Sequence, residues 1–222
     1  MPVFFHYADR VRRDFPELAT RTLCLDAIHP GAEVSQAIAR FQDVASARLA
    51  ASAEGGFPEI QAWRRAFAKM GLKPTQHRCA AEALLRRFRK EGALPRRHPL
   101  IDLCNAASLA YAIPIAVFDV ARIQGVLEVR PASGRETYET FTGELESPEP
   151  GEIIFADEDN RAHARRWTNR QSGYSAVRDD TVAAFLVAEA LHPSAEEDLC
   201  RLLADLEAAL GVSWPRSAVG AG

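Results

Sequence analysis

The chain has 222 residues, of which 47% are hydrophobic, and a formal net charge of −3. This length and composition can bury a sizeable core, and predict one large domain or a domain with a helical appendage. The four cysteines lie far apart, without a CxxC or Cys/His pair at ligand spacing, which argues against a zinc knuckle or a disulfide framework. The longest apolar run, residues 109–118, contains Pro114 and is too short to span a bilayer. We therefore expect a reduced, cytoplasmic setting, no membrane attachment and no metal or other cofactor.

The first 111 residues predict one strand followed by four helices. Apolar and polar residues alternate over 15–28, which indicates a strand, and helical spacing dominates afterwards. The helices are expected over residues 34–49, 58–70, 79–90 and 100–111. The apolar face of the helix over 79–90 is expected to hold Ala80, Ala83, Leu84 and Phe88.

After Pro114 the hydrophobic period changes from helical spacing to alternation, which indicates strands. The strands are expected over residues 114–118, 125–130, 137–141 and 152–156. Two helices are expected to follow over 179–191 and 195–210, and residues 217–222 have the composition of a flexible tail. The predicted fold class is therefore α+β, with helices packed on a mixed or antiparallel β-sheet core.

Positive charge is concentrated in one part of this acidic chain. Residues 63–98 contain eleven Lys or Arg and two acids, so this basic segment carries +9 and the remainder −12. A local basic face is typical of proteins that bind phosphates, although a solvated helix face gives the same pattern more often.

A set of spaced polar and turn residues runs from Leu94 to Thr181. It comprises Leu94-Pro95, Ile101 to Asn105, Pro114, Phe118-Asp119, Gly125 to Arg130, Pro150 to Glu152, Asp157, Arg165 to Arg170 and Ser175 to Thr181. This order and spacing resemble the B3/B4 domain of the bacterial phenylalanyl-tRNA synthetase β subunit, an editing module, and above all its freestanding relatives. The resemblance covers roughly residues 64–191 and implies a B3/B4-like fold. We expect a single domain over 1–216, with an extension (1–57), a family core (58–191) and a C-terminal helix (192–216).

The resemblance implies a pocket for the amino acid esterified to the tRNA 3′ end. Asn105 matches the family's pocket Asn, and Cys104 before it borders the pocket. Asp102 lies on the same helical face as Asn105, where it can instead cap or form an ion pair within the fold. A nucleophile pair of Cys104 and His163 has no supporting local context.

Two departures from the synthetase pattern fall on pocket positions. The family His is replaced by Ala116, so selection of tyrosine does not carry over. The glycine-rich turn is replaced by residues 162–172, which place Ala164, Arg165, Trp167 and Asn169 at the pocket. Trp167 suits stacking on an unpaired base, and Arg165, Arg166 and Arg170 suit the terminal phosphates, although Trp167 could instead belong to the core.

Glu189 is the candidate for the pocket acid, on the helix expected over 179–191, with a solvated helix face as the alternative. These residues favour a trans-editing aminoacyl-tRNA deacylase in which Asn105 and Glu189 position the aminoacyl group and a water. The tRNA acceptor stem would contact Arg86, Arg87, Arg96 and Arg97. No DNA partner is expected, and the motifs of a tRNA ligase are missing from the sequence. A non-catalytic tRNA-binding or RNA-binding module, or a protein acting on a small amino acid derivative, remain alternatives.

Overall fold

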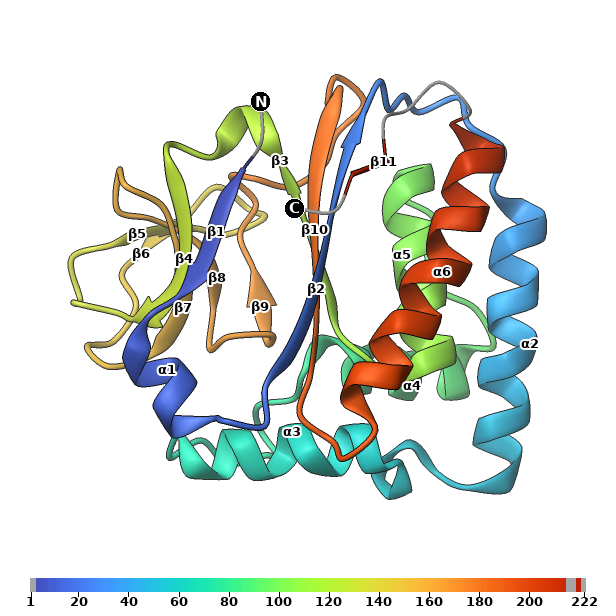
Figure 1. Cartoon of the computed structure of the whole chain (residues 1–222), viewed down its shortest axis with the longest axis horizontal. Coiled ribbons are helices and arrows are strands. Elements are labelled where there is room, and N and C mark those ends of the chain that lie inside the picture. Colours follow the sequence, from blue (N-terminus) through green and yellow to red (C-terminus); the bar gives the residue numbers. More distant parts are fainter. Residues whose placement is uncertain (1–2, 215–218, 221–222) are drawn as a thin grey trace.

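The computed structural model describes residues 3–214 and 219–220. The chain forms three layers, with a four-stranded sheet between a group of helices and a second, mixed sheet (Figure 1). The expected α+β class with helices on a β-sheet core is confirmed.

The central layer is an antiparallel sheet in the order β11-β2-β10-β3, called the small sheet below. Its strands are β2 (Ala19–Asp26), β3 (Ile115–Asp119), β10 (Ala183–Ala190) and β11 (Val219–Gly220). Strand β10 pairs with β2 on one side and with β3 on the other. Strand β11 lies within the tail expected over 217–222, whose other residues fall outside the described ones.

Strand β10 corrects the helix expected over 179–191. Seven of its eight residues are buried, and it contacts the helices through one face and the second sheet through the other. A strand buried on both faces is a continuous apolar run without alternation, and such a run cannot be distinguished from a buried helix by periodicity. Backbone pairing with β2 and β3 makes residues 183–190 a strand.

The outer sheet, called the large sheet, has the order β1-β4-β7-β8-β5-β6, with β9 also paired to β8. It consists of β1 (Phe4–Tyr7), β4 (Val126–Pro131), β5 (Thr137–Glu139), β6 (Leu145–Glu146), β7 (Ile153–Ala156), β8 (Arg161–Arg165) and β9 (Arg170–Gln171). Strands β1 and β4, and β5 and β8, are parallel, while the remaining pairs are antiparallel. The expected N-terminal extension thus contributes one strand to each sheet, β1 to the large sheet and β2 to the small sheet.

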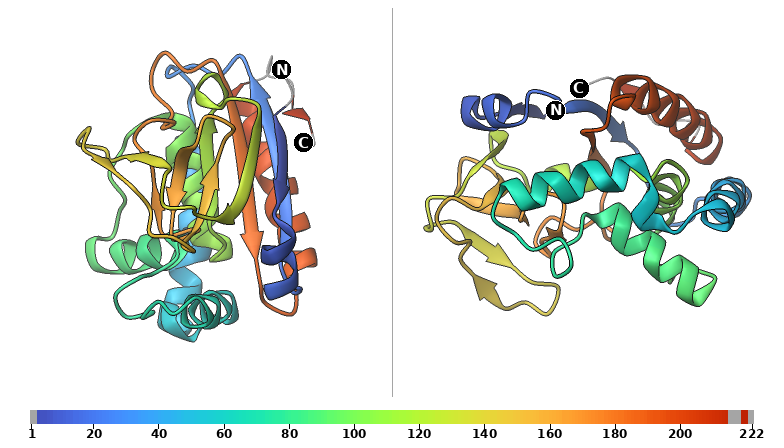
Figure 2. Two further views of the ribbon diagram at one scale, coloured as in Figure 1. Left: turned by 90° about the vertical axis from the view of Figure 1, so that its left-hand side faces the viewer. Right: turned by 90° about the horizontal axis from the view of Figure 1, so that it is seen from below.

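Helices α2 (Ser35–Ala51), α5 (Pro99–Tyr111) and α6 (Ala195–Ser213) cover one face of the small sheet (Figure 1). Helix α3 (Pro58–Lys69) lies across one end of the molecule, as the view from below in Figure 2 shows. Helix α4 (Ala80–Glu91) packs beside α5, and the short α1 (Asp9–Asp14) follows β1. Among the helices of the described residues, none is long and apolar enough to cross a membrane.

The helices expected over 34–49, 58–70, 79–90, 100–111 and 195–210 are present. The apolar face of α4 differs from the expected one. Leu85 and Phe88 are buried there, together with Ala81 and Glu82, while Ala83 is exposed. Glu82 is accommodated on the buried face because Arg64 forms an ion pair with it at 2.6 Å.

Candidate functional site

The candidate site is built around the connection between β8 and β9. This segment, Arg165 to Arg170, is called the 165–170 turn below. Arg166 and Trp167 adopt left-handed backbone conformations, with φ angles of 48° and 57°. This is the conformation that glycine favours, so the turn keeps a glycine-like geometry although the family's glycines are replaced. Two hydrogen bonds hold it: the Trp167 N–H donates to Ile153 O at 2.7 Å, and the Arg166 N–H donates to Glu152 Oε1 at 3.0 Å.

Trp167 is fully buried, which corrects the expectation that it stacks on an unpaired base. Its ring lies edge-on to Trp63 and Phe15, at centroid distances of 5.0 and 4.9 Å. Its indole N–H donates to Glu189 Oε1 at 2.7 Å. The side chain is therefore a core anchor of the 165–170 turn, as the alternative interpretation of the sequence held.

Glu189 is on strand β10 rather than on a helix and is buried beneath the turn. Besides Trp167, the Tyr7 hydroxyl donates to Glu189 Oε1 at 2.7 Å, and that hydroxyl also lies 2.8 Å from Thr20 Oγ1. Burial raises the pKa of Glu189 to about 7, although hydrogen bonds from Tyr7 and Trp167 act in the opposite direction. Trp167 and Tyr7 thus cover Glu189, whereas the catalytic role expected for it requires a carboxylate that is open to the substrate.

A hollow of about 50 Å³ lies beside the 165–170 turn. Its walls contain Ala80, Pro114, Ile115, Ala116, Phe155, Ala164, Trp167, Thr168, Asn169, Arg170 and Gln171. The structure thus brings together five residues expected at the site: Ala116, Ala164, Trp167, Asn169 and Arg170.

The polar wall of this hollow is held in place by side chains that bond to backbone carbonyls. Asn169 Nδ2 donates to Arg78 O at 2.7 Å, and Gln171 Nε2 donates to Val117 O at 2.5 Å. Thr168 Oγ1 is buried and lacks a hydrogen-bond partner among the described residues. Thr168 could not be recognised as a site residue from the sequence, because a single Thr between Trp and Asn forms no motif. Thr168 lines the hollow, while the hydroxyl itself is buried.

Asn105 and Cys104, which were expected in the same pocket, do not line this hollow. Asn105 lines a separate hollow of about 20 Å³ with Asp102, Arg96 and the segment 94–95. Asp102 and Asn105 do share one helical face, as expected, and Asp102 Oδ1 accepts a hydrogen bond from the Arg97 N–H at 2.9 Å. Cys104 is buried among the helices, and burial raises the pKa of its thiol well above the usual value.

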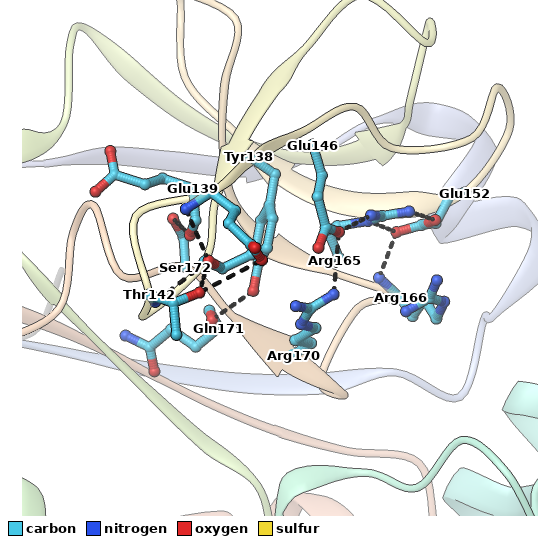
Figure 3. A network of polar contacts seen from close by, with 12 residues as sticks. Tyr138, Glu139, Thr142, Glu146, Glu152, Arg165, Arg166, Arg170, Gln171 and Ser172 are labelled. Carbon is cyan, nitrogen blue, oxygen red and sulfur yellow. Dashed lines mark hydrogen bonds and ion pairs between the residues drawn. The ribbon is translucent and has the colours of Figure 1, made fainter.

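Two arginines of the turn, Arg165 and Arg170, are bound to acids through their side chains (Figure 3). Arg165 is 5% exposed and donates to both oxygens of Glu152 at 2.9 Å, and also to Glu146 at 2.5 Å. Burial would raise the pKa of Glu152, but hydrogen bonds from Arg165 lower it below its ordinary value. A buried guanidinium with two carboxylates is not available to phosphates, so that expected role of Arg165 is wrong. Arg170 is more exposed and shares Glu146 at 3.0 Å, and the Arg166 side chain is half-buried.

The basic segment is less basic in space than in sequence. Arg86 and Arg89 pair with Glu54, Arg87 with Glu91, Arg64 and Arg78 with Glu82, and Arg96 with Asp102. Six of the eleven cations in the basic segment therefore form ion pairs with acids. Two of these acids, Glu54 and Asp102, lie outside residues 63–98, so the net charge of +9 for the segment does not include them. Arg86, Arg87 and Arg96 remain at the surface, and any phosphate would compete there with a carboxylate.

Residues 62–202 match the family described as the B3/4 domain, which is more than half of the chain. The chain belongs to the B3/4 domain family. The match includes the 165–170 turn and all walls of the hollow beside it. No curated protein matches the sequence of the chain.

A solved structure with the same fold is an N-terminal fragment of the phenylalanyl-tRNA synthetase β subunit from Pyrococcus horikoshii. The two superpose with a TM-score of 0.54 over 99% of this chain, at 9% sequence identity. The chain spans 50% of the length of that fragment. At this identity the likeness shows the fold, and the B3/4 relationship stated from the sequence is confirmed.

Proposed function

We propose that this B3/4 protein is a trans-editing aminoacyl-tRNA deacylase, which hydrolyses the ester of a mischarged tRNA. The observation that carries the proposal is the hollow beside the 165–170 turn, which gathers five of the expected site residues in the matched part of the chain. The aminoacyl group would enter this hollow, with its side chain against Ala116, Phe155 and Ala164. In the reaction, water attacks the ester carbonyl carbon and the ribose oxygen leaves with a proton.

The walls suggest how such a reaction would be assisted. Hydrolysis of an activated ester requires mainly that water and carbonyl be held in line, and the tRNA's own vicinal hydroxyl can assist. Thr168 lines the hollow and its buried Oγ1 lacks a partner in the described part of the chain, so we assign this hydroxyl to the substrate or the attacking water, which would reach it when the substrate binds. Glu189 would act through Trp167, by fixing the backbone that presents Thr168.

The size of the hollow favours a short side chain. The hollow is small, at about 50 Å³, and Ala116, Phe155 and Ala164 make part of its wall apolar. We therefore propose an ester of a small amino acid as the substrate.

The test is deacylation of a panel of mischarged tRNAs with small and with aromatic amino acids. We expect faster turnover of the small ones, and failure to hydrolyse any substrate at micromolar enzyme would contradict the proposal. Replacement Thr168→Val keeps the shape and removes the hydroxyl, and should lower kcat/KM about tenfold, the equivalent of one hydrogen bond. Its melting temperature should not fall, because the hydroxyl has no partner in the described part of the chain.

A second candidate is a non-catalytic tRNA-binding module. It is favoured because none of the residues described as lining the hollow is a His, Cys, Asp or Glu that could act as a general base. Binding of tRNA with a steep salt dependence, together with an ester half-life unchanged by saturating protein, would select this candidate.

A further inference from the structure

A second polar cluster lies where the first turn of α3 and the first turn of α6 meet the turn after β10. Glu59 from the first turn of α3, His192 from the turn after β10, and Asp198 from the first turn of α6 converge there. One potential ligand atom from each residue lies within 4.8 Å of the other two. None of these residues lines the hollow beside the 165–170 turn.

The cluster contains buried polar atoms that protein groups leave unsatisfied. Glu59 is 7% exposed and His192 is 3% exposed. Within the described residues, Glu59 Oε2 and His192 Nδ1 have no hydrogen-bond partner. A buried carboxylate oxygen without a donor costs free energy, so Glu59 Oε2 is expected to meet a ligand from solution.

The surrounding groups orient the three side chains and leave one side open. Arg48 Nη2 donates to Glu59 Oε1 at 2.7 Å, which leaves Oε2 as the free oxygen. Asp198 Oδ1 accepts from Arg201, while Oδ2 accepts from Ser194 Oγ at 2.6 Å and lies 2.9 Å from His192 Nε2. Carboxylates that bind metal ions are usually held in this way by outer hydrogen bonds.

The geometry points to a binding site for a divalent transition-metal ion, and we propose that Glu59, His192 and Asp198 bind Zn²⁺. One imidazole and two carboxylates suit Zn²⁺, and three protein ligands leave a fourth position for water. A cavity of about 400 Å³, lined by Glu59, Asp198, Arg48 and Arg201 among others, lies beside the cluster, from which we expect that water to enter. His192 Nδ1 is unbonded in the described residues, so it can carry the ring proton while Nε2 offers its lone pair to the ion.

Charge sets the expected selectivity. The positive charges of Arg48 and Arg201 oppose a cation, whereas Glu59, Asp198 and the nearby Asp205 attract it. With so little excess negative charge, a hard ion such as Mg²⁺, which keeps its own waters, should bind weakly, while the imidazole gives Zn²⁺ an additional bond.

The test is a Zn²⁺ titration of the metal-free full-length protein by calorimetry, in a Cys200→Ser background that removes an exposed thiol. We expect one ion per chain, affinity well above that for Mg²⁺, and a rise in melting temperature with Zn²⁺ concentration. Glu59→Gln and His192→Gln should each weaken binding by at least about tenfold, since even outer-shell changes cost that much. His6→Gln is the matched control, because His6 forms an exposed pair with Glu128 at 3.2 Å, and it should leave the affinity unchanged.

Absence of saturable Zn²⁺ binding, or unchanged affinity in both Glu59→Gln and His192→Gln, would overturn the proposal. Should either variant not fold, Co²⁺ absorption spectra of the unaltered site replace it. Visible d–d bands of a tetrahedral ion with nitrogen and oxygen ligands support the site, and an octahedral aqua-ion spectrum contradicts it. These measurements do not involve tRNA, so their outcome is independent of the deacylase test.

Discussion

Two buried carboxylates, one on each side of the 165–170 turn, have pKa values that are shifted in opposite directions. On the inner side, Glu189 meets the hydroxyl of Tyr7 and the indole of Trp167, and burial raises its pKa to about 7. On the outer side, Glu152 meets the guanidinium of Arg165, and its pKa is lowered despite burial. The two neutral donors of Glu189 do not offset the loss of water around its charge, whereas the cation beside Glu152 does.

The side chains that contact these carboxylates hold the turn between the two sheets. Trp167 and Glu189 connect it to the small sheet, while Arg165 connects it to the β6–β7 part of the large sheet. Thr168 and Asn169 lie between these two anchors and form part of the hollow's wall. The two anchors should therefore respond differently to substitution and to pH.

The largest expected effect is that of Trp167→Ala. Removing a fully buried Trp from the contact with Trp63 and Phe15 should cost about 4 kcal/mol of unfolding free energy. Urea denaturation measures this change. Phe141→Ala is the control, because Phe141 is 70% exposed, and it should stay within about 0.5 kcal/mol. Equal effects of the two substitutions would contradict the assignment of Trp167 to the core.

A smaller effect is expected from pH acting on Glu189. The raised pKa means that the folded state binds the proton more tightly than the unfolded state, whose carboxyl titrates near 4.5. This contribution to stability is complete below pH 4.5 and is lost as the pH rises to about 7, by about 3 kcal/mol. Glu189→Gln should flatten that part of the stability profile, measured by denaturation at a series of pH values. If the stability of the variant falls as steeply with pH as that of the unaltered protein, Glu189 is not the source of this pH dependence.

The smallest of the three effects concerns Arg165. Arg165→Gln should lower the unfolding free energy by about 2 kcal/mol, below the usual cost of breaking a buried pair because Glu146 is partly exposed. Arg170→Gln, at 41% side-chain exposure, should cost less than about 1 kcal/mol. A double-mutant cycle with Glu152→Gln isolates the contribution of the Arg165–Glu152 pair. If the effects of the two single substitutions add, Arg165 and Glu152 do not stabilise the fold through each other, which would contradict this prediction.

Much of the fold and part of the site could be predicted from the sequence. Helices α2 and α3 have one buried apolar face, so their periodicity located them. The hollow was partly predicted because the resemblance to the family placed Ala116, Ala164 and Asn169 at one pocket, and all three line it. Thr168 has no such pattern and was missed. Tyr7, the partner of Glu189, lies 182 positions away in the chain, and no local signal connects the two.

The sequence by itself determined the B3/4 relationship, the α+β class and the positions of helices α2 to α6, because these depend on local spacing and on the order of turn residues. Only the tertiary structure decided that Ala183–Ala190 is a central strand, since both of its faces are covered by distant segments. It also decided which charges are free. Arg165 is neutralised by Glu146 and Glu152, and Trp167 is covered by Trp63 and Phe15, through contacts that form only when the sheets and helices pack together.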